Sequence, residues 1–97
     1  MTPTTGRHRH PGESPTADLV SALGALGVST EHGPGLCRLT ATLRGRRLVL
    51  CRIGGWWAHE RPTTGDTVID RMHPVGMEWI TARVVAGMLA NGCGVQL

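Results

Sequence analysis

The chain has 97 residues and a formal net charge of +3, with 40% hydrophobic and 18% charged residues. This length suffices for one domain with one modest core, and no apolar run approaches the roughly 20 residues that a membrane-spanning helix needs. No apolar segment follows the basic residues near the N-terminus, which argues against a secretory signal. We therefore expect a cytoplasmic protein without a membrane partner.

The residue usage is typical of a GC-rich genome. All ten basic residues are Arg, and Phe and Tyr are absent. We therefore expect a small bacterial protein, in which the Arg content is only a weak indicator of an anionic partner. The three cysteines, Cys37, Cys51 and Cys93, are too few and too widely spaced for a disulfide scaffold.

The N-terminal segment predicts a disordered tail over residues 1–13. Its one strong hydrophobe is Met1, and it contains Pro and Gly together with the run Arg7–His10. Such a segment cannot bury enough apolar surface to offset the entropy lost on ordering. The expected folded domain covers residues 14–97.

A first helix is expected from about Pro15 to Leu26. Ser14 can cap it, and Gly27 is suited to end it. Its apolar residues recur on one helical face: Leu19, Val20, Leu23 and Leu26. Residues 28–32 could then form a short strand.

The clearest pattern is a strict alternation of apolar and polar residues over 37–44, which predicts a half-buried strand. Residues 46–53 predict its antiparallel partner. A three-residue loop 43–45 suits Gly45 and would place Cys37 opposite Cys51. A two-residue turn at Gly45–Arg46 is the alternative and would flip the second strand. The expected apolar face of this hairpin comprises Cys37, Leu39, Ala41, Val49, Cys51 and Ile53.

Two of the three aromatic residues, Trp56 and Trp57, are adjacent and follow Gly54–Gly55. A glycine pair indicates a bend or bulge, and consecutive residues of a strand point to opposite faces. We predict that one ring packs against the second helix and that the other is partly exposed. Burial of both rings at a bent corner is the alternative. The expected helix contacts are Met77, Ile80 and Val84.

The remaining segment predicts a loop over 60–66 and a C-terminal helix from Pro74. Residues 66–73 fit either a helical turn or a brief strand. Asn91 and Gly92 are suited to end the helix. Its expected core face comprises Met77, Ile80, Val84 and Met88. The predicted fold class is α+β, with an N-terminal helix, an antiparallel β-hairpin or three-stranded sheet, and a C-terminal helix packed on one face.

Neither catalysis nor a metal site is expected. Cys51 with His59 or His73 could act as nucleophile and base, but Cys51 lies on the predicted buried face and no catalytic motif accompanies it. The potential metal ligands form no local pairs of the kind that structural zinc sites use: His32, Cys37, Cys51, His59, His73 and Cys93. We expect no cofactor and no small-molecule substrate.

Protein–protein contact is the predicted function. Trp and Arg are enriched at interface hot spots, and Trp56, Trp57 and Arg61 lie within six positions. A core this small often gains stability by association, so a second copy is one candidate partner. We interpret the chain as a small non-catalytic regulatory or accessory binding module.

Nucleic-acid binding through an Arg-rich hairpin is the alternative. Arg can contact phosphates and guanine, and a Trp ring could stack on an unpaired base. The chain contains seven acidic residues and no known reader motif. The candidate contacts are Arg44, Arg46 and Arg47 at the hairpin tip, with Arg38 and Arg52 farther along the strands.

Overall fold

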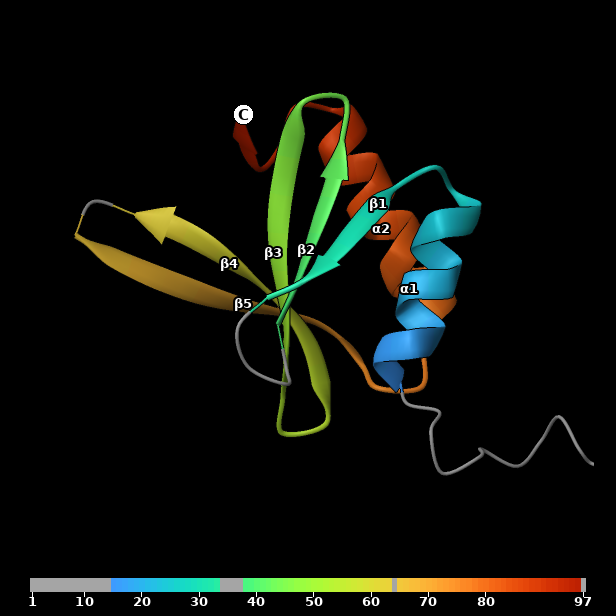
Figure 1. The fold of residues 1–97 in the computed structure, drawn as a ribbon. Coiled ribbons are helices and arrows are strands. Elements are labelled where there is room, and N and C mark those ends of the chain that lie inside the picture. Colours follow the sequence, from blue (N-terminus) through green and yellow to red (C-terminus); the bar gives the residue numbers. More distant parts are fainter. Residues whose placement is uncertain (1–14, 34–37, 64, 97) are drawn as a thin grey trace, which may run out of the picture.

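The computed structural model describes residues 15–33, 38–63 and 65–96 (Figure 1). The predicted tail and Cys37 lie outside these residues. The described residues form two helices and six strands, in the order α1 Pro15–Ala25, β1 Ser29–His32, β2 Arg38–Leu43, β3 Arg46–Ile53, β4 Trp56–Thr63, β5 Asp66–Pro74, α2 Glu78–Ala90 and β6 Val95–Gln96. Within this part of the chain, neither helix combines the length and hydropathy needed to cross a bilayer.

The strands form one antiparallel sheet in the order β1-β2-β3-β4-β5, and β6 pairs with β3. Both helices lie on the same side of this sheet (Figure 1). The predicted α+β class is confirmed, but the predicted two or three strands are too few. Residues 60–63 of the expected loop continue β4, and the undecided segment 66–73 forms most of β5, with which β4 pairs. These residues show no clear alternation of apolar and polar side chains, and they are strands because their backbones pair with each other.

The β2–β3 turn differs from both predicted turns. Leu43 pairs with Arg46, so the loop consists of Arg44 and Gly45 alone. Their φ angles are 54° and 77°, and positive φ at both central residues is the geometry of a two-residue hairpin turn whose twist suits the flanking strands. A non-glycine residue rarely adopts positive φ, which is why Arg44 was not expected there.

This one-residue change of register exchanges the two faces of β3. Cys51 lies opposite Arg38, so the predicted pairing of Cys37 with Cys51 is wrong. Leu48 and Leu50 face the helices, whereas Val49, Cys51 and Ile53 face the other side of the sheet, because neighbouring strand residues point in opposite directions. Ile53 is 48% exposed, and the buried Cys51 lies outside the main core cluster.

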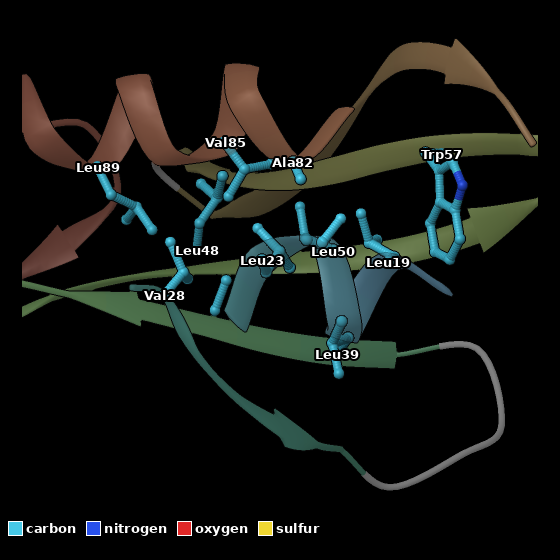
Figure 2. Packing of buried hydrophobic residues seen from close by; sticks show 12 residues of the cluster. Leu19, Leu23, Val28, Leu39, Leu48, Leu50, Trp57, Ala82, Val85 and Leu89 are labelled. Atoms are coloured by element: carbon cyan, nitrogen blue, oxygen red, sulfur yellow. The ribbon is translucent and has the colours of Figure 1, made fainter. Parts of the chain in front are cut away.

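The main core fills the space between the two helices and one face of the sheet (Figure 2). Leu39 pairs with Leu50 and Ala41 with Leu48 at its floor. Trp57, the largest fully buried side chain, lies at one end of this layer, and Leu89 lies at the other (Figure 2). The cluster consists of Leu19, Ala22, Leu23, Val28, Leu39, Ala41, Leu48, Leu50, Trp57, Ala82, Val85 and Leu89.

The core face of α2 also differs from the prediction. Met77, Ile80 and Val84 were expected inside but are 38–44% exposed. Apolar residues occur on two stripes of this helix, so periodicity alone does not select between them. The buried stripe carries the small residues Thr81 and Ala82, which let the helix approach its neighbours closely. Its full set is Glu78, Thr81, Ala82, Val85 and Leu89.

Gly94 allows β6 to dock on β3. Its φ is +89°, and a Cβ added there would lie 2.5 Å from the carbonyl oxygen of Arg47. Gly92 has nearly the same φ, +87°, but an added Cβ would approach no atom closer than 3.7 Å. The two glycines therefore share the left-handed conformation and differ in the space available.

We expect Gly94→Ala to destabilise the fold more than Gly92→Ala. Both substitutions place an L side chain at positive φ, which costs roughly 1–2 kcal/mol. Only Gly94→Ala adds a clash with the backbone. Overpacking of this kind typically lowers the free energy of unfolding by about 1–3 kcal/mol more. Urea unfolding of the two variants measures the difference directly. Equal losses of unfolding free energy would show that β6 does not depend on this close approach.

Candidate protein-interaction surface

Trp57 belongs to the core and is fixed by a buried carboxylate. Gly54 and Gly55 have positive φ and form the turn between β3 and β4, where Ile53 pairs with Trp56. Trp57 is 1% exposed, and its indole Nε1 donates a hydrogen bond of 2.8 Å to Oε2 of Glu78. The backbone N–H of Gly76 donates to the same oxygen at 2.6 Å. The Glu78 carboxylate therefore joins β4 to the start of α2.

Trp56 lies on the opposite side of β4 and is partly exposed. The predicted division between one buried and one partly exposed ring is confirmed. The guanidinium carbon of Arg71 lies over the Trp56 ring, 5.0 Å from its centroid. This distance is that of a cation–π contact. Because Arg71 comes from β5, the contact ties the exposed ring to the neighbouring strand.

The side of the sheet opposite the helices, here called the helix-free face, carries Trp56 together with apolar residues of β3 and β5. Alternation along the paired strands assigns to it Arg38, Thr40, Thr42, Arg47, Val49, Cys51, Ile53, Trp56, Ala58, Glu60, Ile69 and Arg71. Its centre consists of the small buried residues Cys51 and Ala58, which pair with each other. Ile53 and Ile69 are 48% and 43% exposed. No described helix covers this face (Figure 1).

An ion pair crosses the helix-free face from β2 to β4. Nη2 of Arg38 lies 2.7 Å from Oε2 of Glu60, whose side chain is only 12% exposed. The two charges are close, although their orientation is not that of a directed hydrogen bond. Arg38 therefore balances a nearly buried carboxylate and is less available to an external phosphate than the sequence suggests.

Arg61 does not join the two tryptophans. It lies two residues beyond His59 on β4 and therefore points to the side opposite Trp56. Its Nε donates a 2.8 Å hydrogen bond to Oδ2 of Asp70, and Nε2 of His59 lies 3.7 Å from the same oxygen. The bond from Arg61 holds the pKa of Asp70 below its ordinary value. The three predicted contact residues thus occupy three different environments.

The five candidate nucleic-acid contacts also do not form one surface. Arg44 at the turn and Arg47 are exposed, whereas Arg52 is only partly exposed and pairs with Trp57. Arg46 uses Nη1 to donate a 3.2 Å hydrogen bond to the carbonyl oxygen of Gly94. With Arg38 paired to an acidic residue, the exposed positive charge at this hairpin rests mainly on Arg44 and Arg47.

The residues considered for catalysis are separated by the sheet. Cys51 pairs with Ala58, whereas His59 pairs with Leu50 and His73 with Trp57. Cys51 therefore points away from both histidines. Among residues 15–33, 38–63 and 65–96, no group of three or more His, Cys, Asp or Glu side chains is placed to hold a metal ion.

Sequence reasoning missed three surface residues. Arg71 and Ile69 lie on β5, a strand that the sequence left undecided, so their nearness to Trp56 and Glu60 could not be inferred. Trp79 is 58% exposed on α2, the highest value among the large hydrophobic residues described. The helical period was a signal for its exposure, because Trp79 lies outside both the buried stripe and the stripe of Ile80 and Val84 that the sequence predicted.

The chain matches no protein-family model, no curated protein and no solved structure.

Proposed function

We propose that this chain is a small non-catalytic binding module, active in the cytoplasm, that contacts a protein partner through the helix-free face around Trp56. The observation that carries the proposal is the partly exposed Trp56 ring, held by Arg71 and adjacent to Ile53, which is 48% exposed. Aromatic residues and Arg are enriched in protein interfaces and dominate their energetics.

The face is preorganised for contact. Strand pairing fixes the backbone of Trp56, and the guanidinium of Arg71 lies over its ring, so less side-chain entropy is lost when a partner binds. An antiparallel sheet with one solvated face normally places polar residues there. Here Ile53, Trp56 and Ile69 lie exposed or partly exposed among the polar residues, which supports a partner that covers this part of the face.

Nucleic-acid binding through the β2–β3 hairpin is the second candidate. The exposed side chains of Arg44 and Arg47 support it, since free guanidinium groups near a hairpin tip can contact phosphates. The engagement of Arg38 with Glu60 and of Arg46 with Gly94 counts against it. We therefore rank it below protein contact.

The proposal is tested by placing a photo-crosslinking amino acid at position 53 or at position 83 in cells of the source organism. Ile53 lies on the helix-free face, and Arg83 is exposed on α2, on the other side of the sheet. We expect position 53 to give a covalent adduct of one discrete mass that nuclease leaves intact. The adduct should disappear when Trp56→Ala is added.

Position 83 is the matched control and should give no such adduct. Equal adducts from both positions, or none from position 53, would contradict protein contact through this face. An adduct that nuclease digests, and that Arg44→Gln with Arg47→Gln abolishes, would support nucleic acid instead.

A further inference from the structure

The end of the β4–β5 hairpin projects away from the rest of the fold. β4 pairs with β3 only as far as Glu60, which lies opposite Val49. Beyond this point β6 replaces β4 as the neighbour of β3, with Val95 paired to Arg47. The hairpin therefore extends past the sheet and away from both helices (Figure 1). We call Arg61–Thr63 and Asp66–Asp70 the β4–β5 arm.

The outer edge of this arm is a long strand edge. β5 has nine residues and is the last strand of the sheet, and no described strand pairs with its outer side. Such an edge presents N–H and C=O groups that can pair with another strand. A bulge at Met72 interrupts the ladder, because Ala58 pairs with Arg71 and Trp57 with His73. The regular edge therefore runs from Asp66 to Arg71.

We propose that a second copy of this chain pairs with that edge, with the two β5 strands antiparallel across a twofold axis at Ile69. In such a pair the residue on the axis lies opposite its own copy, because the contact is isologous. An axis at Val68 would place Asp66 opposite the partner's Asp70. An axis at Asp70 or Arg71 would place like charges directly opposite each other, which destabilises a strand pair.

The axis at Ile69 avoids these conflicts, and it pairs more of the regular edge than an axis at Thr67, which is also free of like-charge pairs. It places Thr67 opposite the partner's Arg71, and Val68 opposite the partner's Asp70. The two Ile69 side chains, each 43% exposed in the single chain, then contact each other. Because the arm projects from the fold, the helices of the two copies stay apart (Figure 1).

The inference goes beyond the proposed function. Trp56 lies on β4, and β5 separates it from the edge that the second copy would extend, so its ring stays accessible when two arms pair. One dimer would then present two Trp56 sites, which can strengthen binding to a partner with two epitopes. The ladder is far smaller than a standard interface of about 1,600 Å², so we expect a weak dimer that forms at high protein concentration.

Disulfide trapping tests the pairing in the full chain with Cys37, Cys51 and Cys93 changed to Ser or Ala. Opposite Cα atoms in an antiparallel pair lie about 4.5–5.5 Å apart, which a disulfide can bridge. Under mild oxidation Ile69→Cys should therefore form a covalent dimer. Ile53→Cys, at a similarly exposed isoleucine on the same face, should stay monomeric. Mixed Thr67→Cys and Arg71→Cys chains should crosslink more than either chain alone.

Sedimentation without oxidant provides the independent measurement. Ile69→Lys should remove the concentration-dependent dimer, whereas Ile53→Lys should retain it, and circular dichroism should show both variants folded. A wild-type chain that stays monomeric at about 1 mM would overturn the proposal, as would equal trapping at positions 53 and 69. Self-trapping of Val68→Cys in place of Ile69→Cys would overturn the assigned axis. None of these outcomes depends on whether Trp56 binds another protein.

Discussion

Trp57→Ala is expected to lower the free energy of unfolding by about 3–5 kcal/mol, the range for large aromatic side chains removed from cores. Trp57 is the largest fully buried side chain and also donates the hydrogen bond that holds Glu78. Its loss opens a cavity and removes a donor from a buried carboxylate. In a domain of this size, each kcal/mol shifts the melting temperature by roughly 4–8 °C. Thermal and urea unfolding measure the change.

Two variants separate the causes of this loss. Trp57→Phe keeps an aromatic ring but removes the N–H donor, so we expect a smaller loss of about 1–3 kcal/mol. Trp56→Ala removes the same ring type from a partly exposed position and should cost less than either change at Trp57. If Trp56→Ala and Trp57→Ala lowered stability equally, the division of the pair between core and surface would be wrong.

The division of the tryptophan pair could be predicted because it depends on a local rule. Adjacent strand residues point to opposite faces whatever the rest of the sheet does, and Gly54–Gly55 marked the point where the chain turns. The sequence did not determine which ring lies inside. That choice depends on Glu78, which approaches Trp57 from a helix 21 positions away.

The register of the β2–β3 hairpin could not be predicted from composition. It depends on Arg44 adopting a positive φ that its residue type disfavours. The prediction therefore shifted the hairpin by one residue, and a shift of one exchanges the buried and exposed faces of a strand. For this reason Ile53 was expected in the core and instead lies exposed near Trp56.

The contact surface was only partly predictable for a related reason. Trp56 and the enrichment of Arg were visible in the sequence, but Arg61 is close in sequence and points to the opposite side of the sheet. Arg71 is the guanidinium that meets Trp56, and it comes from a strand with no clear apolar alternation. Contacts that strand pairing creates between distant residues cannot be inferred from the spacing of residues along the sequence.

Trp56→Ala should weaken binding of the partner that crosslinks through position 53 by about 30-fold. A central interface Trp typically contributes about 2 kcal/mol or more, which corresponds to a factor of this size. Trp79 is the control: it is more exposed, at 58%, but belongs to α2 on the other side of the sheet. Melting curves should first show that both variants are folded.

The most direct test of the proposed surface is therefore a calorimetric titration of that partner with the wild type, Trp56→Ala and Trp79→Ala. The helix-free face predicts a dissociation constant about 30-fold higher for Trp56→Ala, with Trp79→Ala close to the wild type. Wild-type affinity in Trp56→Ala, or an equal loss in Trp79→Ala, would contradict a contact surface centred on Trp56.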